Sequence, residues 1–181
     1  EEWSLVHVGS ISATRNVPEL WKALAGRIGR DAEFRSRFKL RLIGGVDHTV
    51  QRDLDASGLG PYIERIGQVD HTEALRHMQR ARTLLLPVND TPNVGGFLPA
   101  KVFEYLAVQR PILAVAPLDA DIVRVLGKGH RVVPRGDVAA MRSAVDALFS
   151  DAAVISTVIS SYHRRSLTAQ LAGVLGGLRH H

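Results

Sequence analysis

A lysine and a glutamate stand three residues apart in the stretch GGFLPAKVFEYLA, residues 95–107, directly behind a pair of glycines. On a helix that begins near Pro99, Lys101 and Glu104 share one face close to the helix N-terminus. That end of a helix carries a partial positive charge and presents N–H donors, so it favours anions. The N–H groups expected to face the preceding loop are those of Ala100, Lys101 and Val102.

Each of these residues suits one part of a nucleotide. Gly95 and Gly96 have no side chains, so a phosphate or a sugar can approach their backbone closely. Lys101 supplies a point charge for phosphate, and the two acceptor oxygens of Glu104 match a pair of vicinal hydroxyls, as on a ribose. The alternative interpretation is a surface ion pair, which contributes only about 0.3–0.5 kcal/mol.

The loop GSISATRN, residues 9–16, follows the first expected strand and precedes a helix. We expect its Arg15 to emerge at the edge of the sheet, where a planar guanidinium can grip a diphosphate. The loop lacks the G-x-G-x-x-G pattern and the chain lacks a P-loop motif, so nicotinamide, flavin and P-loop sites gain no support. A solvated loop arginine is the alternative interpretation.

Short aliphatic runs alternate with helical patterns along the chain. The expected strands are residues 4–8, 40–44, 62–69, 83–88, 111–115 and 130–133. The expected helices are residues 17–28, 48–56, 71–81, a segment from about Pro99, 119–126 and 138–149. Asp70 and Glu73 resemble a capping box for the third helix. The fourth strand is apolar at nearly every position, which predicts burial on both faces.

A helix-sized connection separates each expected strand from the next. This alternation predicts an α/β fold: a Rossmann-like, doubly wound parallel sheet of about six strands, with helices on both faces. A stripe on the helix from Pro99 should pack on that sheet, formed by Val102, Phe103 and Leu106. Ligands bind such sheets at the carboxyl ends of the strands, which directs attention to the loops 9–16, 44–47 and 89–100.

The length of 181 residues fits a single domain over residues 1–181, with one or two C-terminal helices from about residue 151. The net charge of +5 favours an anionic partner. The basic residues are mixed with acids and few aromatics interleave with them, which argues against specific nucleic-acid binding. The chain has no cysteine, no apolar stretch long enough to span a membrane and no signal peptide, and it resembles an excised domain.

Four stretches resemble the C-terminal, donor-binding domain of a GT-B glycosyltransferase of family 4 (group 1). They are LVHVGSISATRNVPELWKAL, LRLIGG, YIERIGQVDHTEALRHMQRARTLLLPV and GFLPAKVFEYLAVQRPILAV, and they cover most of residues 4–126. The run P-x-K-x-x-E-Y-L-A is the most specific part. The resemblance implies one half of a GT-B fold, a nucleoside diphosphate sugar as donor substrate, no cofactor and no metal.

The resemblance also implies roles for individual residues. Glu104 matches the second glutamate of the family's E-x7-E motif, which holds the ribose hydroxyls of the donor. Arg15 falls where the family has a basic residue on the donor diphosphate, and Lys101 fits a subgroup with a lysine that assists there. Ser10 occupies the position of the family's other basic residue in this loop. The implied backbone contacts are those of Gly95, Gly96 and Phe97 with the phosphates and sugar, and of Gly67, Gln68 and Val69 with the nucleobase.

One departure concerns the transferred sugar. Gly96 stands where the family has the first glutamate of E-x7-E, near that sugar. The resemblance implies retaining transfer, in which Arg15 and Lys101 stabilise the departing diphosphate. The acceptor would be held by an N-terminal domain absent from this chain, so the isolated domain is expected to be inactive. The alternative, consistent with Gly96, is a non-catalytic nucleotide or nucleotide-sugar binding module of the same fold.

The missing domain also determines where the protein is expected to act. We expect a cytoplasmic protein whose contact with the inner face of the membrane is made through that domain. The segment 161–178 is amphipathic, and in such enzymes the last helix braces the N-terminal domain. An ordinary covering helix is the other interpretation of this segment.

Other chemistry gains little support from the sequence. The eight histidines show no metal-ligand spacing, and His7 lies inside the first strand, where a packed histidine is expected. Asp119 and Asp121 follow the fifth strand and are interpreted as a helix N-cap rather than a Mg²⁺ pair. A G-x-S-x-G elbow is absent, and a signalling receiver would need acidic residues after the first strand, where the chain has GSISATRN.

Overall fold

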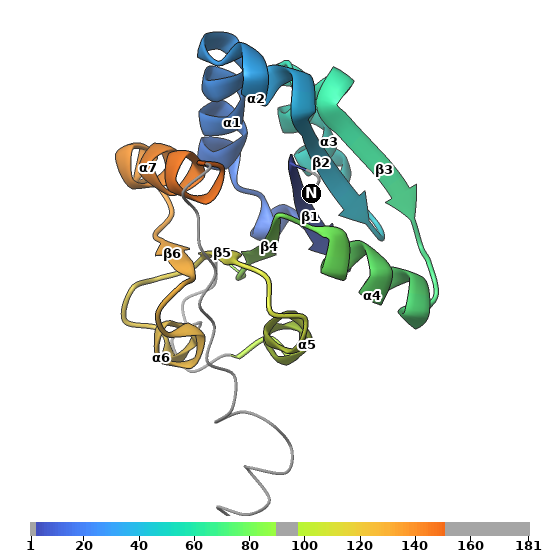
Figure 1. Cartoon of the computed structure of the whole chain (residues 1–181), viewed down its shortest axis with the longest axis vertical. Helices are drawn as coiled ribbons and strands as arrows, with labels where there is room; N and C mark the ends of the chain where they lie inside the picture. The colour runs from blue at the N-terminus through green and yellow to red at the C-terminus, as the bar shows by residue number, and fades with distance from the viewer. Residues whose placement is uncertain (1–2, 90–97, 151–181) are drawn as a thin grey trace, which may run out of the picture.

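A computed structural model describes residues 3–89 and 98–150 of the chain. Within these residues, six parallel strands form one sheet in the order β3-β2-β1-β4-β5-β6 (Figure 1). The strand order reverses between β1 and β4, which makes this the topological switch point of the sheet. The predicted Rossmann-like α/β fold is confirmed. The helices expected from residue 151 lie outside the described residues.

The strands agree with the predicted ranges to within two residues. They are β1 (Trp3–Val8), β2 (Phe38–Ile43), β3 (Ile63–Gly67), β4 (Thr83–Pro87), β5 (Ile112–Val115) and β6 (Arg131–Val133). The helices are α1 (Pro18–Arg30), α2 (Ala32–Arg37), α3 (His48–Ala56), α4 (His71–Arg80), α5 (Lys101–Ala107), α6 (Asp121–Leu126) and α7 (Val138–Leu148). Short 3₁₀ turns are formed by η1 (Ala13–Arg15) and η2 (Gly60–Tyr62).

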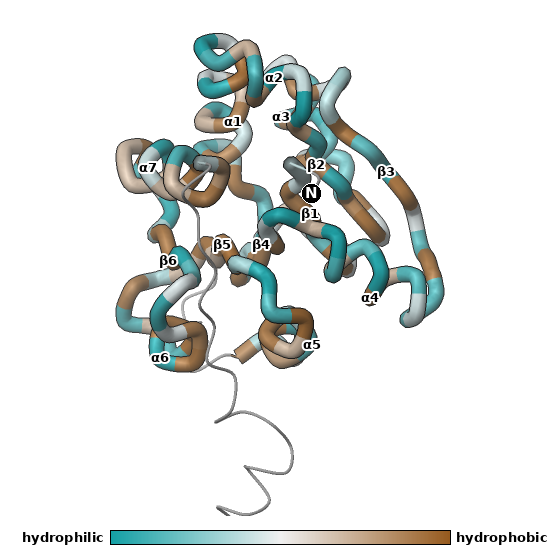
Figure 2. Tube along the Cα trace, viewed as in Figure 1, coloured by the Kyte–Doolittle hydropathy of each residue, from teal (hydrophilic) through white to brown (hydrophobic). Residues whose placement is uncertain are grey.

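The sheet separates two hydrophobic layers (Figure 1). On one face it packs against α1, α2, α3 and α7, with Trp21, Phe34 and Phe149 fully buried. On the other face it packs against α4, α5 and α6, with Met78 and Tyr105 fully buried. All five residues of β4 are buried, as its apolar sequence predicts, and the neighbouring β5 is a hydrophobic run (Figure 2).

Aspartates begin four of the helices, because a carboxylate accepts a hydrogen bond from an otherwise unpaired N–H group of the first turn. Asp70 accepts from the N–H of Glu73 at 2.8 Å, as predicted. Asp31, Asp47 and Asp137 do the same for α2, α3 and α7. The N-cap predicted from Asp119 and Asp121 is wrong: α6 begins after Ala120, which has no side-chain cap, and Asp121 is in the first turn.

Two further predictions need correction. The short helix α2 was not predicted, although Asp31 caps it by accepting from the N–H of Phe34 at 2.9 Å. The predicted stripe on α5 included Phe103, which is 44% exposed. Tyr105 takes its place in the core and is fully buried, so the buried face of α5 is formed by Val102, Tyr105 and Leu106.

The ladder between β1 and β4 ends early. Its last pair is Val6 with Leu84, although β1 continues to Val8 and β4 to Pro87. A continued parallel ladder needs the N–H of residue 87 as a donor to the carbonyl of Val8, and proline has no N–H. The two strands therefore part at their carboxyl ends, at the switch point.

Over residues 3–89 and 98–150, every helix is too short or too polar to cross a bilayer.

Candidate functional site

A cleft of about 210 Å³ opens where β1 and β4 part. Its walls include the loop after β1, the end of β4 and the approach to α5. Arg15 and Lys101, which are 86 residues apart in the sequence, both line it, together with Gly9 and Pro99. The structure thus brings the two cations predicted from sequence to one cleft at the carboxyl edge of the sheet.

Two side chains form hydrogen bonds with backbone groups of β1 and β4 that lose their partners where these strands separate. The N–H of Val8 donates to the hydroxyl oxygen of Tyr105 at 2.9 Å. Nδ1 of His7 lies 3.1 Å from the carbonyl oxygen of Leu85, and since a carbonyl only accepts, this nitrogen carries the proton. In a continued ladder the N–H of Val8 and the carbonyl of Leu85 would bond to each other. The cleft therefore opens without leaving these two groups unpaired.

His7 is a packed histidine, as predicted, but it also lines the cleft. Burial lowers the pKa of His7, and the positive charges of Arg15 and Lys101 lower it further. The imidazole is therefore neutral at neutral pH. Its Nε2 is buried and has no hydrogen-bond partner among the described residues.

Arg15 is partly buried and is held by two acceptors. Its Nε donates to Oδ1 of Asn89 at 2.6 Å, and its Nη1 donates to the carbonyl of Ser10 at 3.1 Å. Asn89 was not among the residues predicted from sequence. Its position two residues after the end of β4, at the ligand edge of the sheet, was the signal that could have identified it.

Lys101 and Glu104 form an ion pair, with Nζ 2.9 Å from Oε2. Both side chains are about one-third exposed, so each can exchange its partner for a ligand. Lys101 lines the cleft, whereas Glu104 is not among its lining residues. One expectation about this segment is wrong: the N–H of Val102 is not free, because it donates to the carbonyl of Pro99 at 2.9 Å.

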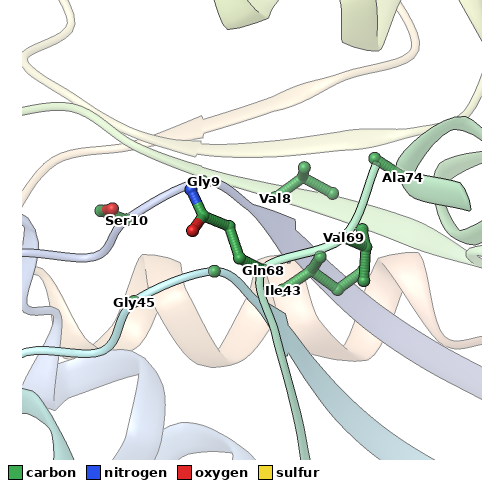
Figure 3. A pocket seen from close by; sticks show the side chains of 9 residues that line it. Val8, Gly9, Ser10, Ile43, Gly45, Gln68, Val69 and Ala74 are labelled. Carbon is green, nitrogen blue, oxygen red and sulfur yellow. The ribbon is translucent and has the colours of Figure 1, made fainter. Parts of the chain in front are cut away.

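A second pocket, of about 130 Å³, lies beside the cleft and shares Val8 and Gly9 with it. It is formed by the loops after β1, β2 and β3, and its floor includes Ile43. The side chain of Gln68 extends across it toward Gly9, and Val69 lies against its wall (Figure 3). Predicted residues Ser10, Gln68 and Val69 therefore line one pocket.

Glycines let the three loops approach one another closely. Gly9 follows β1, Gly44 follows β2 and Gly67 is the last residue of β3. Their φ angles are 119°, 116° and 68°, respectively. The N–H of Gly9 donates to the carbonyl of Ile43 at 2.8 Å, and the N–H of Gly44 donates to the carbonyl of Gly67 at 2.6 Å. A Cβ on Gly44 would lie 2.7 Å from the carbonyl oxygen of Gly9. Gly67 thus shapes the turn that presents Gln68 and is not itself a lining residue.

Arg135, in the loop after β6, was also missed by sequence reasoning. Its guanidinium donates to the carbonyls of Thr14, Asn16 and Val88. Val88 directly follows β4, and the other two residues flank Arg15. An arginine at the carboxyl end of the last strand, between Pro134 and Gly136, was the available signal.

The remaining predicted residues, Gly95, Gly96 and Phe97, lie outside the described part of the chain. Over residues 3–89 and 98–150, no three histidine, aspartate or glutamate side chains are grouped so that they could hold a metal ion.

A family model for glycosyl transferases group 1 matches residues 2–151 of the chain. The chain belongs to the group 1 glycosyl transferases. No match was found among curated proteins. The family match covers both the cleft and the neighbouring pocket, and it confirms the resemblance at the level of this family.

Several solved structures have a similar fold. Sucrose-phosphate synthase from Thermosynechococcus elongatus is similar with a TM-score of 0.69 and 18% identity, over 98% of this chain and 46% of its own. HepE from Anabaena, in complex with UDP-glucose, has a TM-score of 0.68 and 14% identity, over 98% of this chain and 49% of its own. The chain thus spans about half the length of these two proteins.

A third similar structure is the C-terminal domain of a group 1 glycosyl transferase, LpcC from Francisella tularensis. Its TM-score is 0.61 and its identity 14%, over 82% of this chain and 76% of its own. At these identities the likeness shows the fold, which is that of one half of a GT-B glycosyl transferase.

Proposed function

We propose that this group 1 glycosyl transferase chain is the donor-binding half of a retaining enzyme of family 4. It would bind a nucleoside diphosphate sugar and present it to an acceptor held by a separate N-terminal domain. The length ratio to sucrose-phosphate synthase and HepE supports such a second domain. The complex of HepE with UDP-glucose supports a nucleotide sugar as the ligand class.

The observation that carries the proposal is the pair of adjoining pockets at the switch point. One contains two cations, Arg15 and Lys101, and the other contains no charged lining residue. They share Val8 and Gly9, so a single ligand can extend from one to the other. A diphosphate suits the first pocket and a nucleobase suits the second, which is the order of groups in a nucleoside diphosphate.

Within this proposal each residue has a distinct role. Arg15 and Lys101 contact the diphosphate and stabilise the charge that develops when the bond between the sugar and the diphosphate breaks. Glu104 gives up its ion pair with Lys101 and binds the ribose hydroxyls instead. Gln68 and Val69 bound the nucleobase. The electron pair of the broken bond stays on the diphosphate. The hydroxyl oxygen of the acceptor, which the N-terminal domain holds, forms the new bond to the sugar and gives its proton to the departing diphosphate.

Calorimetric titration of the 181-residue chain with UDP, ADP and GDP tests the binding role. We expect at least one to bind, and we expect Arg15→Ala and Glu104→Ala to weaken binding by about tenfold or more each. Arg15→Ala should act on diphosphates more than on the matching nucleosides. Glu104→Ala should remove the preference for ribose over 2′,3′-dideoxyribose.

The pair Glu33 and Arg37 provides matched controls, because its Nη1–Oε1 distance is 2.8 Å and it lies on α2, away from both pockets. Glu33→Ala and Arg37→Ala should leave nucleotide binding unchanged. Equal binding by wild type, Arg15→Ala and Glu104→Ala would contradict the site.

A binding module without catalysis is the second candidate, and Gly96, in place of the family's first E-x7-E glutamate, favours it. The full-length protein separates the two. Transfer or donor hydrolysis supports the enzyme, and tight nucleotide binding without turnover supports the module.

A further inference from the structure

We propose that Arg135 is a positioning residue that holds the loop 9–16 against the end of β4 and thereby places Arg15 for diphosphate binding. This inference rests on the proposed function, because it assigns a purpose to the fixed position of Arg15. It goes beyond that function by naming a residue from the far end of the sheet that lines neither pocket.

The contacts of Arg135 join two loops that are distant in sequence. Nη2 donates to the carbonyl of Thr14 at 3.1 Å and to that of Val88 at 2.8 Å. Nη1 donates to the carbonyl of Asn16. One planar guanidinium therefore spans the loop after β1 and the end of β4, with Arg15 between the two loop residues that it holds.

The same two loops are joined a second time on the ligand side. Arg15 donates to Oδ1 of Asn89, the residue after Val88, at 2.6 Å. Arg135 and Arg15 thus hold the loop at two consecutive residues, Val88 and Asn89, just after the end of β4. If Arg135 is removed, the carbonyls of Thr14 and Asn16 lose this donor, and the Arg15–Asn89 bond is left to hold that part of the loop to β4.

The far end of the loop is held independently. Nδ2 of Asn16 donates to Oδ2 of Asp53 at 2.6 Å, and Nε1 of Trp21 donates to Oδ1 of Asn16 at 2.9 Å. These bonds attach the loop to α1 and α3 but not to β4. Loss of Arg135 should therefore loosen the loop where it meets the end of β4 without detaching it from the helical layer.

The geometry favours arginine over lysine at this position. Three carbonyls from two segments are reached by a rigid, planar fork with five N–H groups. A lysine ammonium retains the positive charge but not this fixed geometry. Arg135→Lys therefore separates the clamp from the general effect of a positive charge near an anion.

The experiment compares wild type, Arg135→Gln and Arg135→Lys. Each is titrated with UDP, ADP and GDP and with uridine, adenosine and guanosine, and backbone hydrogen exchange is measured without ligand. We expect both variants to lose about fivefold or more in affinity for the nucleoside diphosphate, and less than about twofold for its nucleoside. The amides of Arg15 and Asn16, which donate to Ser12 and Ala13, should exchange faster in both variants.

Arg82→Gln is the matched control. Arg82 also joins β4 to the rest of the fold through backbone carbonyls, with Nε 3.2 Å from the carbonyl of Leu148, but at the opposite end of the strand. Its loss should lower thermal stability as much as Arg135→Gln does, yet leave the ratio of diphosphate to nucleoside affinity unchanged. A purely structural role for Arg135 would give the two variants the same ratio.

The outcomes distinguish the two proposals. If wild type binds a nucleoside diphosphate and Arg135→Lys binds it equally well, the clamp is overturned and the donor site stands. If wild type binds none of the three, the proposed function fails, and the role of Arg135 in diphosphate binding fails with it. Unchanged exchange at Arg15 and Asn16 in Arg135→Gln overturns the clamp in either case.

Discussion

At the scale of single residues, Gly44 is a position in the site where an added side chain would clash with the backbone. Its φ of 116° is unfavourable for any residue with a Cβ, and a Cβ there would lie 2.7 Å from the carbonyl oxygen of Gly9. Gly9 is the matched control, because its φ is 119° but a Cβ on it would meet nothing within 4 Å. Both alanine variants are strained, and only Gly44→Ala also forces two loops apart.

We therefore expect Gly44→Ala to lower the free energy of unfolding by about 1–3 kcal/mol more than Gly9→Ala does. Urea denaturation followed by circular dichroism measures both values. Because the second pocket is formed by these loops, Gly44→Ala should also weaken nucleotide binding relative to wild type. Equal destabilisation by the two variants would mean that the loops can separate freely.

Sequence patterns predicted which single residues gather at the ligand edge when those residues lie in, or just after, a loop that follows a strand. Arg15, Lys101 and Gln68 belong to this group, because strand order alone brings their loops together. Asn89 and Arg135 follow strands too, but their roles depend on hydrogen bonds to loops that are distant in sequence. Residue type and spacing carry no information about such contacts.

At the scale of elements, the position of α5 depends on Tyr105. Its hydroxyl is the acceptor for the N–H of Val8, a bond that attaches the helix bearing Lys101 and Glu104 to the strand that ends at Gly9. Burial raises the pKa of Tyr105, so the hydroxyl stays protonated. The bond replaces the strand pairing that ends at Val6 and Leu84.

Tyr105→Phe keeps the aromatic ring and removes the hydroxyl oxygen that accepts the hydrogen bond from Val8. We expect a loss of about 1–3 kcal/mol in the free energy of unfolding, because the buried N–H of Val8 is left unpaired. Tyr62→Phe is the control, since Tyr62 is only partly buried. Denaturant unfolding checks both. Equal, small losses would show that water or another group replaces the hydroxyl.

Helices and strands were predicted well where a capping residue and the spacing of apolar residues indicate the same element. Residues 48–56 form α3 as predicted, because Asp47 caps the helix and Val50 and Leu54 share its buried face. The face of α5 was predicted wrongly, because Phe103 and Tyr105 are both aromatic and the bond between Val8 and Tyr105 cannot be read from the sequence. A short helix such as α2 lacks the periodicity that would reveal it.

At the scale of the whole molecule, stability should depend on pH through a buried histidine that connects two strands. His130 is 6% exposed, and its Nδ1 accepts a hydrogen bond from the N–H of Ile112 at 3.1 Å. Burial lowers the pKa of His130 from 6.5 to about 4. Protonation of Nδ1 would also abolish its ability to accept this bond.

The unfolded chain therefore binds a proton at a higher pH than the folded chain. Above pH 6.5, His130 should add no pH dependence to the free energy of unfolding. As the pH decreases from 6.5 toward 4, the free energy of unfolding should fall. The His130 contribution amounts to at most about 3 kcal/mol. The lowered pKa of His7 acts in the same direction.

His130→Asn tests the assignment, because its Oδ1 can accept from Ile112 but does not titrate in this range. Urea unfolding of wild type and variant between about pH 7 and 4.5 should show a shallower loss of stability in the variant. This window lies above the ordinary pKa of the helix-capping aspartates, whose own pKa values are lowered at Asp31 and Asp47. Identical slopes would mean that the fold does not lower the pKa of His130.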